Sequence, residues 1–205
     1  MPTTEYNRLR TNIKKITKGF LSFDKRSDGN YSWQELMLCR AFISFCHAEF
    51  EHYLEESCLR VIAKAEKHWC RHGKPTTAIA ALLAYRMPGP GTMPDKPSEQ
   101  SSGNRLATLI NNVITSQRSA VRRNHGIKPT NISQLFIPLG IKPNQVPNTL
   151  EIQLENFGKN RGDQVHQSSS VSLPNIRDPF DDELKEVNYL LDELLRLDSV
   201  ICQLR

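Results

Sequence analysis

The chain has 205 residues, a net charge of +5 and a hydrophobic content of 38%, with 12 prolines and 10 glycines. This composition excludes a fibrous or disordered chain, and the length suits a single domain with an exposed loop or two. No apolar run approaches the roughly 18 residues that a membrane span needs, and the N-terminus lacks the apolar core of a signal peptide, so we expect a cytoplasmic protein without a membrane partner. The five cysteines have no regular spacing, which favours reduced thiols over a disulfide framework.

Charge is distributed unevenly along the chain. Residues 100–150 contain six Lys and Arg but no Asp or Glu, and residues 1–26 contain seven Lys and Arg against two acids. Residues 176–205 reverse the sign, with eight acids against four basic residues. Basic stretches of this kind favour a polyanionic partner such as RNA, and a solvated charged surface is the alternative.

Helical periodicity dominates, and no strand pattern is evident. The first predicted helix is basic and spans residues 3–24, before the turn signal at 28–30. Ser32 with Glu35 three residues later forms a capping box, which predicts the start of a long helix over residues 33–72. The apolar stripe of that helix contains Cys39, Phe42, Ile43, Cys46, Phe50, Tyr53, Leu54, Cys58 and Val61. Its three cysteines are therefore expected to pack in the core.

Shorter helices are predicted further along the chain, over residues 76–86, 104–124, 131–137 and 146–157. The helix over 104–124 is expected to turn these side chains inward: Leu106, Leu109, Ile110, Val113, Ile114 and Val121. Between the first two of these helices, residues 87–104 are rich in Pro, Gly and Ser, which predicts an exposed loop.

The final helix is predicted to begin at Asp178-Pro179, an N-cap followed by proline at the first helical position. Its wide apolar stripe suits a bundle core and a dimer seam as well. We therefore expect an all-α bundle of four to five main helices plus short helices. Residues 1–32 would form a basic helix and turn packed on a domain of residues 33–205.

Two further groups of histidines each allow two interpretations. His68 and His72 have the i, i+4 spacing of a metal-binding pair, but no further Cys or Asp cluster completes a site. A polar helix end is therefore favoured, and neither a metal nor another cofactor is expected. His125 lies beside Arg122 and Arg123 and is a candidate for RNA binding, with an ordinary loop histidine as the alternative.

The stretch "ENFGKNRGDQVHQSSS" (155–170) combines Arg161 with His166, five residues later. We expect Gly158 to end the preceding helix and the backbone to bend between Gly158 and Gly162, because residues five apart on an unbroken helix point about 140° apart. Such a bend would bring the two side chains into one groove. Arginine is a permanent cation suited to phosphate, and histidine exchanges a proton near neutral pH. Spacing alone is not specific, and a surface arginine beside a histidine hydrogen-bonded in a turn is the plain alternative.

Three motifs together resemble the HEPN superfamily, in particular its RiboL-PSP type. They are "AEFEHYLEE" (48–56), "NHGIKPTNISQLFIPLGI" (124–141) and "FGKNRGDQVHQSS" (157–169). In that group an LGI-like segment precedes a helix that ends in an R-x4-H element followed by small polar residues. The resemblance covers residues 33–205 and leaves the basic N-terminus outside. It also singles out Glu51 over Glu49 as the glutamate of the first core helix.

The resemblance implies a helical bundle that forms a homodimer, with two R-x4-H elements facing each other. Catalytic members are metal-independent endoribonucleases, often in toxin–antitoxin systems or antiviral defence, where a partner protein is expected. His166 would act as general acid or base, Arg161 would stabilise charge on phosphorus, and Glu51 and Asp163 would orient the pair. The residues proposed to bind RNA are Arg118, Arg122, Arg123, His125 and Lys159. The alternative is a non-catalytic HEPN module that binds RNA, a nucleotide or a partner protein, and a purely structural helical adaptor is a third reading.

Overall fold

The computed structural model describes residues 1–86, 102–166 and 176–204, apart from the side chains of residues 102–104 and 164–166. Its α-helices are α1 (Thr4–Phe20), α2 (Trp33–His72), α3 (Thr77–Arg86), α4 (Ser102–Arg122), α5 (Pro129–Phe136), α6 (Asn148–His166) and α8 (Lys185–Ile201). Shorter helical turns are η2 (Ile137–Leu139), η3 (Pro143–Gln145) and η5 (Pro179–Leu184). These described residues contain no strand, which confirms the all-α prediction, and their seven α-helices exceed the four or five main helices expected.

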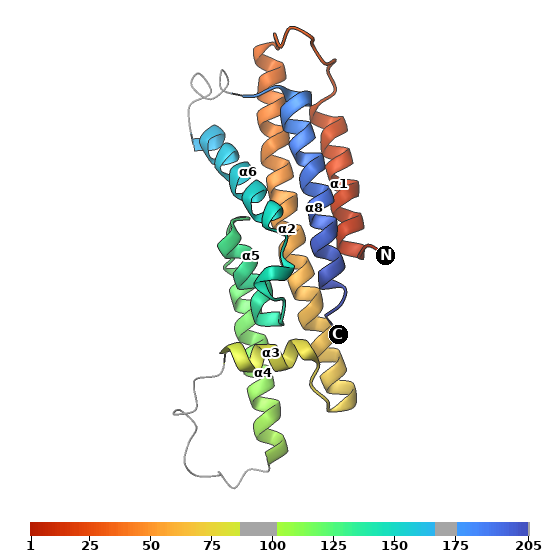
Figure 1. The fold of residues 1–205 in the computed structure, drawn as a ribbon, viewed down its shortest axis with the longest axis vertical. Coiled ribbons are helices and arrows are strands. Elements are labelled where there is room, and N and C mark those ends of the chain that lie inside the picture. Colours follow the sequence, from red (N-terminus) through yellow and green to blue (C-terminus); the bar gives the residue numbers. More distant parts are fainter. Residues whose placement is uncertain (87–101, 167–175, 205) are drawn as a thin grey trace.

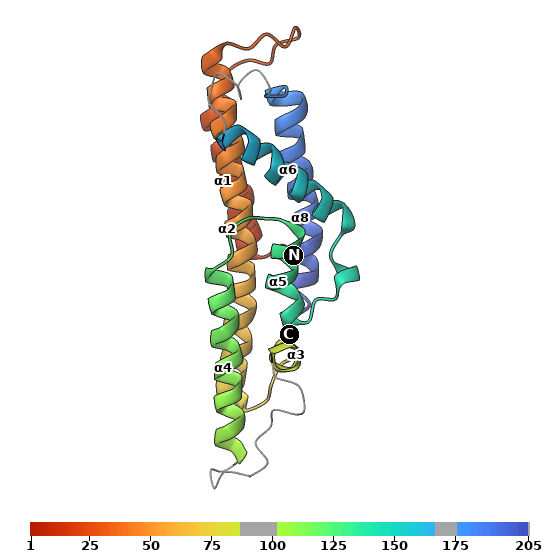
Figure 2. The same ribbon diagram turned by 90° about the vertical axis from the view of Figure 1, so that its left-hand side faces the viewer.

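The long helix α2 is the spine of the molecule. Two views show α1 and α8 alongside one half of α2 and α4 alongside the other half, with α6 crossing between α2 and α8 (Figure 1, Figure 2). Ser32 and Glu35 form the predicted capping box at its start, and Gly73 ends it in the left-handed conformation with φ 63°. The predicted helix over residues 33–72 is therefore confirmed.

A buried carboxylate connects α1, α2 and α8. Asp198 on α8 is 1% exposed and accepts hydrogen bonds from the backbone N–H and the hydroxyl of Thr3, at 2.8 and 2.5 Å. It also accepts a hydrogen bond of 3.0 Å from the hydroxyl of Tyr53 on α2. These three hydrogen bonds replace the ones that the Asp198 carboxylate would make with water, which lowers the cost of burying it. Because Thr3 is also the N-cap of α1, Asp198 fixes where that helix begins. α1 ends at Phe20, short of the predicted residue 24, because Leu21 turns into the core.

The core between α2 and its neighbours contains the three cysteines of the predicted stripe. Cys39, Cys46 and Cys58 are fully buried free thiols, and the Cys58 thiol donates to the carbonyl of Leu135 at 3.2 Å, so their packing role is confirmed. The inward prediction for α4 was wrong for Leu106, which is exposed. Leu106 lies in the second turn of α4, near the end of the helix that extends past α3 (Figure 1).

α6 continues without interruption from residue 148 to residue 166, across both glycines. We expected Gly158 to end this helix and the backbone to bend before Gly162, and both expectations were wrong. The part of α6 before Gly158 is anchored in the core by three buried side chains, Leu150, Leu154 and Phe157. Glycine inside a helix costs only about 1 kcal/mol relative to alanine, which this burial outweighs.

The remaining predicted boundaries have mixed outcomes. Asp178 caps the last helical segment by accepting from the N–H groups of Phe180 and Asp181 at 2.8 and 2.7 Å, which confirms the predicted start. Most of the predicted loop, residues 87–101, lies outside the described residues, and residues 102–104 already belong to α4.

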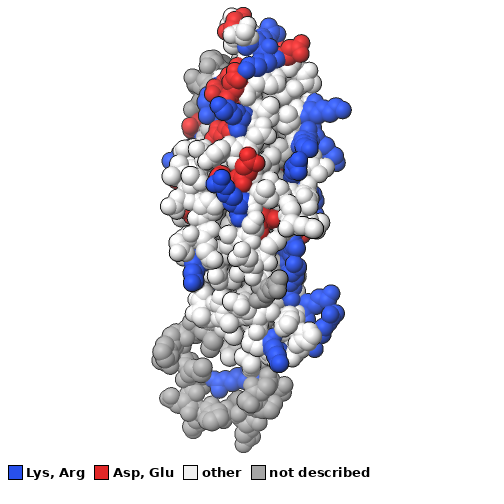
Figure 3. All heavy atoms as spheres, turned by 45° about the vertical axis from the view of Figure 1, so that its right-hand side comes forward, with Lys and Arg blue, Asp and Glu red and all other residues white. Residues whose placement is uncertain are grey.

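The surface carries a strip of basic side chains along the edge that α1 forms (Figure 3). The exposed cations of α1 are Arg8, Arg10, Lys14, Lys15 and Lys18. Among the residues that the structure describes, no helix combines the length and the apolar character needed to cross a membrane.

Candidate functional site

A surface pocket of about 430 Å³ opens where α2, α6 and the loop after α4 meet. It is lined by His47 and Glu51 of α2, by His125, Gly126, Ile127 and Lys128 of the loop, and by Gly158, Arg161 and Gly162 of α6. Glu51, His125 and Arg161 were predicted from motifs that lie far apart along the chain. The fold brings these three residues together.

The loop is held against α2 by two glutamates. The backbone N–H of Gly126 donates to the carboxylate of Glu51 at 2.5 Å, and the Asn124 side chain donates to Glu55 at 2.9 Å. The Asn131 side chain in turn donates to Asn124 at 3.0 Å, which connects the loop to the first turn of α5. Gly126 adopts φ 114°, a conformation that residues with a side chain rarely adopt. These bonds give the pocket a defined wall.

The wall formed by α6 is low because two of its residues are glycines. A Cβ built at Gly162 meets nothing within 4 Å, and one built at Gly158 would lie 3.9 Å from His47 Nε2. The imidazole of His47 therefore faces α6 at Gly158. Larger residues at these two positions would project into the pocket beside Arg161.

Arg161 supplies a cation with an unused donor. Its side chain is partly buried, and its Nε atom is buried without a hydrogen-bond partner among the described residues. An unpaired buried donor costs about 1–3 kcal/mol, and this cost would be recovered if the side chain turned so that a ligand oxygen could accept from it. A guanidinium suits a phosphate or carboxylate because it offers several donors in one plane.

His47 is one of two pocket residues with functional side chains that were not predicted from the sequence. Its side chain is 11% exposed, its ring stacks on Phe157 at 6.4 Å between centroids, and its Nδ1 lies 4.0 Å from Glu51 Oε2. Burial lowers the pKa of His47 below its ordinary 6.5, the positive charge of Arg161 lowers it further, and Glu51 opposes both. The signal in the sequence was the i, i+4 spacing between His47 and Glu51, which places both side chains on one face of α2.

His166 is the last residue of α6, one turn beyond Gly162, and its side chain lies outside the described residues. Because α6 is continuous, the bend that we expected to bring Arg161 and His166 together within one chain does not exist. Asp163 is exposed and does not line the pocket. The catalytic roles assigned to these residues stay predictions.

The predicted RNA-binding residues have different surroundings. Arg118 forms two hydrogen bonds with Glu66 on α2, at 3.0 and 2.6 Å, so it links α4 to the spine. Lys159 pairs with Glu155 one turn earlier on α6, at 3.0 Å. Arg122 and Arg123 are exposed at the end of α4, and His125 lines the pocket.

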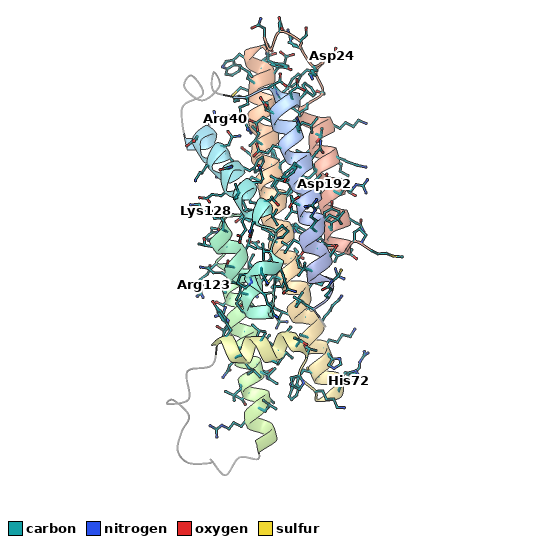
Figure 4. The ribbon with its side chains drawn as sticks, viewed as in Figure 1. Asp24, Arg40, His72, Arg123, Lys128 and Asp192 are labelled. Carbon is teal, nitrogen blue, oxygen red and sulfur yellow. The ribbon has the colours of Figure 1, made fainter. Side chains whose placement is uncertain are left out.

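Lys128 also lines the pocket, and it is the second residue that was not predicted. Figure 4 labels it with Arg123 on the side of the molecule where α4 and α5 lie. Its position one residue before the first turn of α5 is set by a hydrogen bond of 3.0 Å from its own N–H to Asn131.

The rings of His68 and His72 lie 4.6 Å apart at the end of α2. Within the part of the chain that the structure describes, no three His, Cys, Asp or Glu side chains are grouped so that they could hold a metal ion.

Comparison with known proteins gives one family match. A family model described as RiboL-PSP-HEPN matches residues 4–199, nearly the whole chain. No curated protein and no solved structure matches. The match begins at residue 4, so it includes α1, and the expectation that the resemblance leaves the basic N-terminus outside was wrong.

Proposed function

The chain belongs to the RiboL-PSP-HEPN family, and on this basis we propose that it is an endoribonuclease that cleaves RNA without a metal ion. In the proposed reaction the 2′-oxygen attacks the adjacent phosphorus, the bond to the 5′-oxygen breaks, and the products end in a 2′,3′-cyclic phosphate and a 5′-hydroxyl. The observation that carries the proposal is Arg161, whose buried Nε has no partner among the described residues of a pocket that also holds imidazole and carboxylate groups.

Arg161 would bind the phosphate that is cleaved. Negative charge grows on its oxygens as the 2′-oxygen attacks, and a fixed cation at that place lowers the barrier. Interactions of this kind are worth about 3–4 kcal/mol, or about 10²–10³ in rate. Because Gly158 and Gly162 carry no side chain, the sugar-phosphate backbone could approach α6 closely at the pocket.

His166 would transfer a proton as general acid or general base, as the resemblance implies. Glu51 would orient the site, since its carboxylate accepts the N–H of Gly126 and lies close to His47. Asp163 is exposed outside the pocket lining, so the proposal leaves the orienting role to Glu51.

The rim of the pocket would hold the RNA strand. His125 and Lys128 line the pocket, and Arg122 and Arg123 are exposed just before them in the chain. Cations along a strand contribute affinity that depends on salt and only weakly on base sequence. Arg118 and Lys159 are already paired with glutamates, which makes them weaker candidates.

We further propose, from the family resemblance, that the chain works in the cytoplasm as a homodimer and takes part in a toxin–antitoxin or antiviral defence system with a partner protein. A dimer would place two R-x4-H elements across one interface. On an unbroken α6, Arg161 and His166 of one chain point about 140° apart. The two side chains could therefore meet only between copies, and this arrangement would bring Arg161 of one copy near His166 of the other.

A second candidate function is a non-catalytic module that binds RNA or a nucleotide. One observation favours it: α6 is continuous through Gly158 and Gly162, so a single chain has no break in the helix that joins Arg161 to His166. In that case Arg161 would hold a phosphate in the pocket without any cleavage.

The test is to incubate end-labelled RNA with the purified protein in excess EDTA. We expect the wild type to produce cyclic phosphate ends, and Arg161→Ala and His166→Ala each to lower the rate at least about 100-fold. Arg71→Ala is the matched control, because Arg71 is exposed near the end of α2, about 30 Å along the helix from Glu51. Cleavage that both variants retain contradicts the proposal, and binding without cleavage by the wild type supports the module.

A further inference from the structure

Cleavage of RNA by its own 2′-hydroxyl needs two proton transfers. The 2′-oxygen must lose a proton, and the leaving 5′-oxygen must gain one. The R-x4-H element brings a single imidazole per chain, His166, which can serve one of the two transfers. The other transfer needs a second group, which is either the His166 of a second copy or another side chain of the pocket.

His47 can supply the second group. It comes from α2, lines the same pocket as Arg161 and faces α6 through its Nε2 atom, which lies 3.9 Å from the place of a Cβ at Gly158. Its ring is held by stacking on the buried Phe157. A ring fixed in this way can present one nitrogen to a ligand without a large loss of side-chain entropy.

The other nitrogen of the ring faces a carboxylate. His47 Nδ1 lies 4.0 Å from Glu51 Oε2, while the N–H of Gly126 donates to the other oxygen, Oε1. A carboxylate beside Nδ1 favours the tautomer with its proton on that nitrogen, so the lone pair of Nε2 is directed to the side where Gly158 lies. At 4.0 Å the two atoms are too far apart for a hydrogen bond, so Glu51 acts on the ring through its charge, on the side where an acidic residue orients a histidine base.

The charges around His47 favour its neutral form. Glu51 on the same helix is the acidic group that faces the ring, while Arg161 faces it from α6 and His125 and Lys128 line the same pocket from the loop. Burial, followed by the charge of Arg161, lowers the pKa of His47, so the imidazole is unprotonated at neutral pH and able to accept a proton.

We propose that His47 is the general base of the reaction and that His166 is the general acid, an assignment that rests on the function proposed above. His47 Nε2 takes the proton of the 2′-hydroxyl as the 2′-oxygen bonds to phosphorus. The bond from phosphorus to the 5′-oxygen breaks, and that oxygen takes a proton from His166. Glu51 holds the imidazole in the required tautomer, and Arg161 binds the phosphate.

The test compares His47→Gln with His52→Gln, a matched control because His52 is an exposed histidine on the same helix. Single-turnover cleavage is measured from about pH 5 to pH 9, with binding measured on RNA that carries a 2′-deoxy sugar at the cleaved position. We expect His47→Gln to lower the cleavage rate by about 10²–10⁴ while binding changes less than about threefold, and His52→Gln to change neither.

Glu51→Gln provides a second variant that does not depend on the fold tolerating a change at His47. Glutamine can still accept the N–H of Gly126, but it removes the charge that raises the pKa of His47. The acidic limb of the pH–rate profile should therefore move to lower pH. A role of Glu51 in holding the loop alone would leave that limb in place.

Three outcomes would overturn the assignment. If His47→Gln cleaves at the wild-type rate with the wild-type pH profile, another group, such as the His166 of a second copy, is the base. If binding of the 2′-deoxy RNA falls as much as cleavage does, His47 has a structural role. If the wild type does not cleave RNA at all, the proposed function fails, and the role of His47 as general base fails with it. If activity is lost in Arg161→Ala but kept in His47→Gln, only the role of His47 is contradicted.

Discussion

Asn124 connects the loop after α4 to Glu55 on α2 through a hydrogen bond of 2.9 Å. The same side-chain amide donates to the carbonyl of Gly126 at 3.2 Å, and Asn124 itself is 7% exposed. One buried side chain thus sets the position of the segment that carries His125 and Lys128 into the pocket.

Replacing Asn124 with alanine should therefore weaken both the fold and the pocket. The change leaves partners of a partly buried network unsatisfied, so we expect a loss of about 1–3 kcal/mol in the free energy of unfolding. Phosphate or RNA binding at the pocket should weaken as the loop is released. Urea denaturation measures the first effect and titration with labelled RNA the second. Asn112→Ala is the control, because Asn112 is exposed on α4, and it should change stability by less than about 0.5 kcal/mol.

Much of the fold could be predicted because its signals are local. The Ser32 capping box, the proline after Asp178 and the apolar stripe of α2 each depend on neighbouring residues, and the helices begin where these signals predict. Gly158 misled the prediction for α6, because a glycine ends a helix only where its backbone leaves the helical conformation, and α6 continues through Gly158. The buried side chains Leu150, Leu154 and Phe157 all precede it, and the described side chains after it are partly buried or exposed, so no apolar face beyond Gly158 marks the continuation of the helix.

The candidate site was predicted only in part, for a related reason. Arg161, Glu51 and His125 were selected from motifs, whereas His47 looked like one more residue among the apolar positions of α2. Its importance comes from what faces it, namely Gly158 and Phe157 of a helix about 110 residues away in sequence. Spacing along one helix cannot reveal such a partner, although the i, i+4 relation to Glu51 was available.

The continuity of α6 can be tested with alanine at Gly162. A Cβ at this position meets nothing within 4 Å, and the backbone does not have a positive φ, so alanine should raise stability by about 0.5–1 kcal/mol through its higher helix propensity. Gly126→Ala is the contrasting variant, because φ 114° strains a residue with a side chain, and it should lower stability by about 1–3 kcal/mol. A loss of stability in Gly162→Ala would indicate a bend after all. Thermal denaturation of both variants decides the point.

The pKa of His47 predicts how stability depends on pH. Burial and Arg161 lower this pKa in the folded protein below the ordinary value of 6.5, so the unfolded chain binds a proton more readily. The contribution of His47 to stability is therefore complete above pH 6.5 and is lost as the pH falls below it. As the pH is lowered from about 8 to about 5.5, we expect the free energy of unfolding of the wild type to fall more than that of His47→Gln. A difference that stays constant over that range would mean that the imidazole is not held neutral.

Salt dependence should separate the basic residues that contact RNA from those that support the fold. Arg122 and Arg123 are exposed beside the pocket loop, whereas Arg118 forms a two-bond pair with Glu66. Each phosphate contact to a single strand contributes about 0.7 to the slope of log K against log salt concentration. The double variant Arg122→Ala and Arg123→Ala should therefore weaken RNA binding and reduce the slope by about 1.4, if each arginine contacts one phosphate. Arg118→Ala should leave the slope unchanged and cost at most about 1 kcal/mol of stability, since this pair, about one third exposed, is screened by solvent. An equal change of slope in both proteins would mean that the RNA passes along α4 instead of over the pocket.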